Sequence, residues 1–166
     1  MSDASDKLCF LVVDDQPLIT GALSMLLTSE NPDSEVFTAN SVDEARKLVH
    51  SHAPEADLLI LDLSMPGVVG TNLLEEFVRE EPSLKILVLS GVTDRESVMN
   101  TLSLGAAGFV PKTLDTDLLL TAIHFVLKGG VYLPSKIIEE SQRRGFFAEA
   151  GEGIAGRMAS APTLTP

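Results

Sequence analysis

The residues that could do chemistry in this chain are charged and hydroxyl side chains that follow short apolar runs. Asp14 and Asp15 come directly after the first run, and Asp62 comes after the third. Ser90 ends the fourth run, and Lys112 closely follows the fifth. If these runs are neighbouring parallel strands, their carboxyl ends meet at one edge of a sheet. We therefore expect three carboxylates, a hydroxyl and an ammonium to share one pocket.

Each of these residues also has an ordinary structural explanation when it is taken alone. An Asp pair ahead of a helix with Pro17 in its first turn is commonly a helix-start device. Ser90 could begin a loop, and a lysine near a helix start is usually solvated. The joint placement favours chemistry, because unrelated turn residues have no reason to gather at one edge of a sheet.

Carboxylates gathered in one pocket need a counterion. Two of them about 4 Å apart repel by about 4 kcal/mol at an effective dielectric of about 20. Such a group either raises a carboxyl pKa or recruits a cation, and carboxylate oxygens with room for water suit Mg²⁺. With Lys112 to meet a phosphoryl oxygen, the parts for phosphoryl transfer are present. The chain has no G-x-x-x-x-G-K-[ST] motif, so a donor other than bound ATP is indicated.

The elements that must position these residues are strands and helices in strict alternation. The apolar runs predict strands at Leu8–Val13, Glu35–Ala39, Leu58–Leu61, Ile86–Ser90 and Gly108–Val110. Apolar residues at helical spacing predict helices at Leu18–Ser29, Val42–His52, Leu73–Glu80, Glu96–Leu104 and Asp117–Leu127. Runs that are apolar throughout are typical of a parallel sheet covered on both faces. Right-handed crossovers then give an α/β fold with a doubly wound sheet.

Composition sets limits on partners and location. The 166 residues suffice for one domain and a tail, and the formal charge of −12 repels a nucleic acid backbone. We expect this chain by itself not to bind DNA. No apolar run is long enough to cross a membrane, and the polar segment 1–7, predicted to be disordered, is no secretory signal. The single Cys9 cannot form an internal disulfide, so we expect a cytoplasmic protein.

Four motifs, in this order and spacing, resemble the receiver domains of two-component response regulators. They are Val12-Val13-Asp14-Asp15, Asp62-Leu63-Ser64-Met65-Pro66-Gly67 with Gly70, Ser90-Gly91, and Gly108-Phe109-Val110-Pro111-Lys112. The resemblance covers residues 8–128. It implies the CheY-like, flavodoxin-like sheet, with five parallel strands in the order 2-1-3-4-5 and five flanking helices.

The resemblance also implies a role for each acidic residue. Asp62 would accept a phosphoryl group from the phosphohistidine of a sensor histidine kinase, forming an acyl phosphate. Mg²⁺ would be held by Asp15, Asp62 and the backbone carbonyl of Ser64, with Asp14 acting through water. Lys112 would pair with the carboxylate or with the phosphoryl group. The domain would not be an enzyme in the ordinary sense, although it promotes its own phosphorylation and dephosphorylation.

Two further residues would turn phosphorylation into a signal. Ser90 would donate its hydroxyl to the phosphoryl group, and Phe109 would turn inward to fill the space left behind. This would switch the face formed by the helix near Glu96–Leu104, the last strand and the last helix, and a homodimer would form on phosphorylation. Phe109 as an ordinary core residue remains the alternative.

The end of the chain predicts a linker. Gly129-Gly130 ends the last helix, and Val131–Pro134 forms a short apolar latch. Segment 129–166 is then linker, and 135–144 is compatible with one short helix. Thr113 after Lys112, together with this latch, resembles the NarL/FixJ branch, whose members carry a LuxR-type helix-turn-helix. We expect DNA to be contacted, and transcription controlled, only through such a C-terminal domain, which is absent from these 166 residues.

Three other interpretations stay open at this point. A haloacid-dehalogenase-like phosphatase also uses an Asp nucleophile, Mg²⁺ and Lys, but places its nucleophile after the first strand. A pseudo-receiver signals without phosphorylation, although it would normally lack Asp15, Asp62 or Lys112. A stand-alone receiver would act in a phosphorelay or in protein–protein signalling, with no DNA-binding partner domain.

Overall fold

Strands and helices alternate along the whole described part of the chain. The computed structural model describes residues 7–68, 70–112 and 115–134. Its strands are β1 (Cys9–Val13), β2 (Glu35–Ala39), β3 (Leu58–Asp62), β4 (Ile86–Ser90) and β5 (Gly108–Pro111). Its helices are α1 (Pro17–Glu30), α2 (Val42–His52), α3 (Asn72–Glu80), α4 (Arg95–Ser103) and α5 (Thr116–Leu127). All ten predicted elements are confirmed, and their bounds agree to within one residue.

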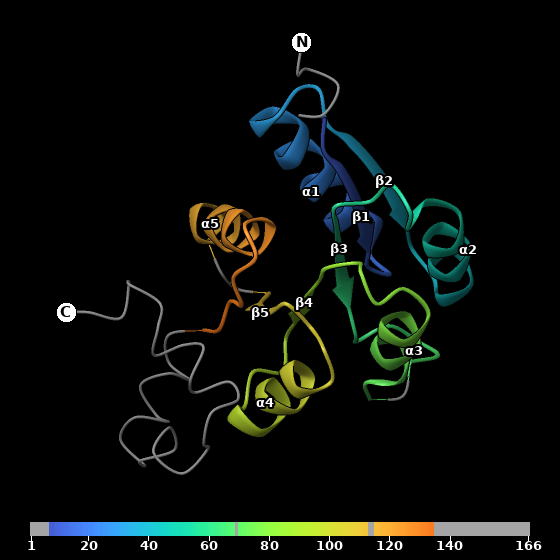
Figure 1. The fold of residues 1–166 in the computed structure, drawn as a ribbon, viewed down its shortest axis with the longest axis vertical. Helices are drawn as coiled ribbons and strands as arrows, with labels where there is room; N and C mark the ends of the chain where they lie inside the picture. The colour runs from blue at the N-terminus through green and yellow to red at the C-terminus, as the bar shows by residue number, and fades with distance from the viewer. Residues whose placement is uncertain (1–6, 69, 113–114, 135–166) are drawn as a thin grey trace, which may run out of the picture. The chain divides into compact units, whose positions relative to one another are not determined.

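The five strands form one parallel sheet in the order β2-β1-β3-β4-β5 (Figure 1). This confirms the predicted fold and strand order. The register aligns the ends of neighbouring strands, with Val13 opposite Leu61 and Ser90 opposite Pro111. Residues that follow β1, β3, β4 and β5 therefore emerge at the same edge, which we call the carboxyl edge of the sheet.

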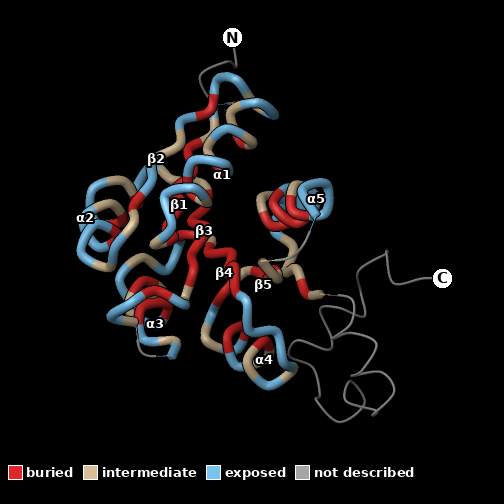
Figure 2. The backbone as a smooth tube through the Cα atoms, turned by 180° about the vertical axis from the view of Figure 1, so that it is seen from behind, coloured by how far each residue is buried: buried red, intermediate tan, exposed pale blue. Residues whose placement is uncertain are grey.

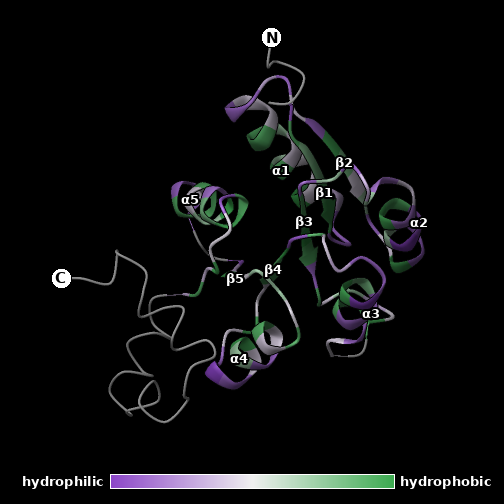
Figure 3. Cartoon of the chain, viewed as in Figure 1, coloured by the Kyte–Doolittle hydropathy of each residue, from purple (hydrophilic) through white to green (hydrophobic). Residues whose placement is uncertain are grey.

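Both faces of the sheet are covered. Strands β1, β3 and β4 are buried at every position, so the middle of the sheet is red in Figure 2 and hydrophobic in Figure 3. Helices α1 and α5 lie on one face, and α2, α3 and α4 lie on the other (Figure 1). The cluster under α1 and α5 contains Phe10, Val12, Leu23, Leu27, Leu58, Ile60, Leu87, Leu89, Val110, Leu119, Ala122, Ile123 and Val126. Burial of this apolar surface on both faces makes the sheet a rigid support for the loops at its edge.

The chain divides into two compact units, Met1–Tyr132 and Leu133–Pro166. The first unit holds the whole sheet and all five helices. The second lies almost entirely outside the described residues, and so does the predicted helix at 135–144. Most of the N-terminal segment predicted to be disordered also lies outside them. Within the described part, no helix is long and apolar enough to cross a membrane.

Candidate functional site

The predicted carboxylates meet at the carboxyl edge of the sheet. Asp14 and Asp15 directly follow β1, and Asp62 is the last residue of β3. One carboxylate oxygen from each lies within 4.8 Å of the others. Asp14 and Asp62 are buried, with 1% and 0% of their surface exposed, whereas Asp15 is half-buried. The sheet thus holds two ionisable acids out of water and a third at the rim.

Lys112 supplies the positive charge of this cluster. Its Nζ lies 3.1 Å from Oδ2 of Asp14 and 3.1 Å from Oδ2 of Asp62. It has the geometry of a hydrogen bond only toward Asp62. Lys112 directly follows β5, and its backbone N–H donates to the carbonyl of Ser90 at 2.9 Å. The two outer strands of this half of the sheet therefore position one ammonium between two buried carboxylates.

One buried oxygen in the cluster lacks a hydrogen-bond donor. Oδ1 of Asp62 accepts from the backbone N–H of Ser64 at 2.9 Å, and Oδ1 of Asp14 accepts from that of Gln16 at 3.0 Å. Oδ2 of Asp14 accepts no hydrogen bond from any described residue, and has only its ion-pair contact with Lys112. A buried carboxylate oxygen left in this way is costly unless a cation or water approaches it. The donor set therefore fits a hard divalent cation such as Mg²⁺.

The acids after β1 do not cap the helix that follows them. The residue at the start of α1 is Gln16, and its side chain makes no capping hydrogen bond. By contrast, the side chains of Ser41 and Asp94 accept from backbone N–H groups of α2 and α4. Helix α1 begins instead with Pro17, whose missing N–H needs no cap. Asp14 holds the turn before the helix by accepting from the N–H of Gln16, but within the described part of the chain neither acid accepts from an N–H of α1 itself, so the helix-start explanation accounts for them only in part.

The electrostatics of the site reflect this crowding. Burial raises the pKa of Asp14, although the hydrogen bond from Gln16 and the contact with Lys112 act in the opposite direction. The neighbouring charge of Asp62 raises it further. Burial by itself would lower the pKa of Lys112, but the two carboxylates outweigh it and the pKa is raised. At neutral pH Lys112 is therefore charged, and this charge lies between the carboxyl groups of Asp14 and Asp62.

Ser90 reaches the carboxyl edge, but its hydroxyl is bonded within its own loop. Its Oγ accepts from the backbone N–H of Val92 at 3.0 Å and donates to the carbonyl of the same residue at 3.3 Å. Among the described residues, neither Asp62 nor Lys112 is bonded to this hydroxyl. A role for Ser90 at a phosphoryl group would require these two bonds to change.

Phe109 lies one strand away, in the middle of β5. It is 2% exposed, and it is not part of the cluster under α1 and α5 that includes its neighbour Val110. Because side chains alternate along a strand, Phe109 faces the opposite side of the sheet, where α4 lies (Figure 1). The predicted switch residue is thus a buried core residue in this structure.

The loop after Asp62 depends on two glycines. Gly67 and Gly70 have φ of +89° and +58°, in the left-handed region that favours glycine. They follow Ser64, whose N–H holds Oδ1 of Asp62 and whose carbonyl is a predicted metal ligand. Gly67, which follows Pro66, and Gly70 therefore set the path of the backbone beside the carboxylates.

Asn40 is a site residue that the sequence analysis missed. It directly follows β2, and its Nδ2 donates to the backbone carbonyl of Asp14 at 2.8 Å and to Oγ1 of Thr20 at 3.0 Å. These bonds tie the start of the Asp14-Asp15 loop to β2 and to α1. The signal was available, because Asn40 is another polar residue directly after a strand of the same sheet.

Known proteins resemble this chain in sequence. Residues 10–124 match the family described as the response regulator receiver domain. The glycerol metabolism activator of Pseudomonas putida is 34% identical over 135 residues, which cover 81% of this chain and 61% of that protein. The curated relatives of this kind are longer, and the chain spans 55% to 61% of their length.

Two solved structures have a fold similar to that of this chain. A two-component response regulator of the LuxR family from Aurantimonas sp. SI85-9A1 superposes with a TM-score of 0.75 at 22% identity, covering 85% of this chain and 99% of that one. The CheX–CheY–BeF3–Mg²⁺ complex from Borrelia burgdorferi has a chain with a TM-score of 0.69 at 26% identity, covering 76% and 93%. The matches thus agree on one domain type and extend over the whole carboxyl edge.

Proposed function

Because this chain belongs to the response regulator receiver domain family, we propose that Asp62 accepts a phosphoryl group from the phosphohistidine of a sensor histidine kinase. An oxygen of Asp62 attacks phosphorus, the P–N bond breaks, and the histidine nitrogen leaves with the electron pair. The observation that carries the proposal is the position of Asp62, with Oδ2 3.1 Å from the ammonium of Lys112. This charge would meet the negative oxygens of the group in transfer.

A divalent cation fits beside the nucleophile. We assign its ligands to Asp15, Asp62 and the backbone carbonyl of Ser64, with Asp14 acting through water. When bound, Mg²⁺ would neutralise charge on the phosphoryl oxygens. The support is the gathering of three carboxylates within 4.8 Å, together with the buried Oδ2 of Asp14 that has no hydrogen-bond donor among the described residues.

Access to Asp62 requires a local movement. Its surface is fully buried, and its two oxygens already bond to Ser64 and Lys112. The donor can reach it only when the loop after β3 or the side chain of Lys112 moves aside. The loop after β4 offers room, because a Cβ added at Gly91 would meet no described atom within 4 Å.

The output of the domain would pass through α4, β5 and α5. A covalent phosphoryl group adds a charge of about −1.5 to −2 and three strong acceptors. Ser90 would give up its bonds to Val92 and donate to one acceptor, and Phe109 would move into the space released. Either movement changes the packing between β5 and α4, and a packed interface changes between discrete arrangements rather than gradually.

We infer that the full protein regulates transcription in the cytoplasm. The matched relatives are regulators longer than this chain, and the LuxR-family neighbour supports a DNA-binding domain after the receiver. DNA contact would belong to that C-terminal domain, and phosphorylation would promote a homodimer. A stand-alone receiver in a phosphorelay has no specific observation in its favour.

The proposal is tested by incubating the chain with acetyl phosphate and Mg²⁺ and measuring its intact mass. We expect one phosphoryl group to be added to the wild type and none to Asp62→Asn. Asp57→Asn is the matched control, because Asp57 directly precedes the same strand at its other end and is hydrogen-bonded to Cys9 of β1. An adduct that persists in Asp62→Asn, or a wild type that gains no mass, would refute the proposal.

A further inference from the structure

The outer edge of β5 is paired with the segment that follows α5. Tyr132 forms a parallel bridge with Gly108. The backbone N–H of Tyr132 donates to the carbonyl of Ala107 at 3.1 Å, and the N–H of Phe109 donates to the carbonyl of Tyr132 at 3.1 Å. We call this pair of hydrogen bonds the Tyr132 clip. It satisfies backbone groups that an edge strand otherwise leaves open to solvent or to another chain.

The clip depends on small residues on both sides. A Cβ at Gly108 would lie 2.7 Å from Cδ1 of Leu87 and 3.2 Å from Cβ of Tyr132. A Cβ at Gly130 would overlap the ring of Phe125 on α5. Larger residues at either position would therefore push the returning chain away from β5. The close approach is thus a property of the sequence and not only of the local backbone path.

β5 both bonds to Tyr132 in the clip and leads directly into Lys112, the positively charged residue of the site. Lys112 directly follows β5, and its Nζ lies 3.1 Å from Oδ2 of Asp62. On the inner edge of β5, the N–H of Lys112 donates to Ser90 at 2.9 Å. On the outer edge, the N–H of Phe109 donates to Tyr132. The last three residues of β5 and Lys112 therefore connect the contact with the phosphoacceptor to Tyr132, the last residue of the first unit.

We propose that the Tyr132 clip transmits the state of Asp62 to the chain that follows Tyr132, and that phosphorylation weakens it. This inference rests on the proposed function. A phosphoryl group carries more negative charge than the carboxylate that it modifies, so it attracts Lys112 more strongly. The end of β5 is drawn toward the site, away from the edge where Tyr132 bonds. Inward movement of the Phe109 side chain would act on the residue whose amide donates to the clip.

Coupling of this kind is reciprocal. If phosphorylation opens the clip, then a chain with an open clip binds a phosphoryl mimic more tightly. Beryllium fluoride with Mg²⁺ is the probe, because it forms a reversible complex and allows an equilibrium measurement. The clip itself is followed by amide hydrogen exchange at Phe109 and Tyr132 in two-dimensional NMR spectra.

We expect exchange at the amides of Phe109 and Tyr132 to become about tenfold faster on addition of beryllium fluoride and Mg²⁺. The amide of Ala107 is the internal control, because it donates to Ile86 on the inner edge at 2.8 Å and should stay protected. Unchanged exchange at both clip amides in the bound chain would overturn the inference.

Two variants of Tyr132 separate the contribution of its backbone N–H from that of its side chain. Tyr132→Pro removes the N–H that donates to Ala107, whereas Tyr132→Phe keeps this amide and the aromatic ring. We expect Tyr132→Pro to bind beryllium fluoride about fivefold more tightly than the wild type, and Tyr132→Phe to bind it equally. Equal affinity in all three chains would count against the coupling. If Tyr132→Pro does not fold, Gly108→Ala, which crowds Tyr132 from the strand side, is measured in its place.

The outcomes distinguish this inference from the proposed function. If Asp62 gains a phosphoryl group while the clip amides keep their protection, the clip inference alone is wrong. If the wild type gains no phosphoryl group and binds no beryllium fluoride, both are wrong. If the adduct forms, the clip amides open, and Tyr132→Pro binds more tightly, both are supported.

Discussion

The two ends of β3 carry an aspartate each, and the structure uses them differently. Asp57, directly before the strand, accepts from the backbone N–H of Cys9 at 2.8 Å and donates its own N–H to the carbonyl of the same residue at 2.8 Å. It continues the pairing of β1 with β3. Asp62, at the other end, faces Lys112 and two further acids. An aspartate at a strand end becomes a candidate for chemistry only when other charges converge on it.

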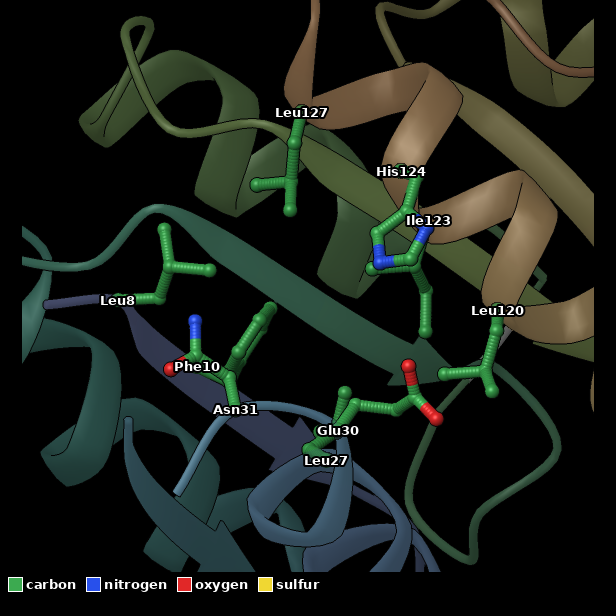
Figure 4. Close-up of a pocket in the computed structure, with 9 residues that line it drawn as sticks. All are labelled: Leu8, Phe10, Leu27, Glu30, Asn31, Leu120, Ile123, His124 and Leu127. Carbon is green, nitrogen blue, oxygen red and sulfur yellow. The ribbon is translucent and has the colours of Figure 1, made fainter. Parts of the chain in front are cut away.

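The same contrast holds on a larger scale at the opposite edge of the sheet, where the strands begin. We call it the amino edge. A pocket there is lined by Leu8, Phe10, Leu27, Glu30, Asn31, Leu120, Ile123, His124 and Leu127 (Figure 4). Apolar side chains from β1, α1 and α5 make most of its wall. Nearby, Lys85 donates to the carbonyl of Leu127 at 3.3 Å. Asp57 and Lys85 complete backbone bonding at this edge, whereas at the carboxyl edge three carboxylates and an ammonium are held against one another.

Replacing the lysine at each edge should give the largest difference. Lys112→Met leaves Asp14 and Asp62 buried without their cation, and removal of one partner from a buried ion pair costs about 3–5 kcal/mol. We expect about 3 kcal/mol without Mg²⁺, because the Lys112 side chain is 25% exposed. Lys85→Met removes one hydrogen bond and should cost about 1 kcal/mol. Urea unfolding of both variants measures the two losses, and equal losses would remove the distinction between the edges.

Mg²⁺ should stabilise the folded chain by binding at the carboxyl edge and not at the amino edge. A ligand at about one hundred times its Kd adds about 2.7 kcal/mol to the free energy of unfolding. We expect this gain in the wild type and in Asp57→Asn, and a smaller gain in Asp14→Asn. The measurement is the urea midpoint with and without Mg²⁺. A full gain in Asp14→Asn would mean that the cation binds without Asp14.

The pH dependence of the free energy of unfolding should differ between the wild type and Asp14→Asn. Burial raises the pKa of Asp14 above its ordinary 3.8, so the folded chain holds this proton at a pH where the unfolded chain has lost it. The contribution to stability is greatest below pH 3.8 and is lost as the pH rises through the folded pKa. The wild type should therefore lose stability relative to Asp14→Asn across this window without Mg²⁺. Parallel urea midpoints for the two chains would contradict the assignment.

At the amino edge, the thiol of Cys9 neighbours Asp57 and should show an effect on reactivity rather than on stability. Burial, and then the charges of Glu55 and Glu35, raise the pKa of Cys9 to about 11. The thiol stays protonated near neutral pH, and only the thiolate is a good nucleophile. Iodoacetamide at about pH 8 should modify the folded chain far more slowly than the chain in urea. Equal rates, followed by intact mass, would show that the thiol is not protected.

Most of the fold could be read from the sequence, because its signals are local. Apolar runs and helical spacing set all ten elements to within one residue. The parallel sheet follows from runs buried on both faces, and right-handed crossovers then bring the ends of β1, β3 and β5 to one edge. The meeting of Asp14, Asp62 and Lys112 was predictable for this reason, whereas their chemical roles remain proposals.

Only the tertiary structure shows which segments far apart in the chain contact one another. The sequence could not say that Oδ2 of Asp14 lacks a hydrogen-bond donor among the described residues, because that depends on the atoms of four loops. Nor could it say that Asn40 holds the loop after β1, or that Tyr132 returns to bond beside Gly108. The residue types allowed several partners for each group. Packing of the helices on a rigid sheet selected one of them, since a buried polar group must find its partner within hydrogen-bond distance.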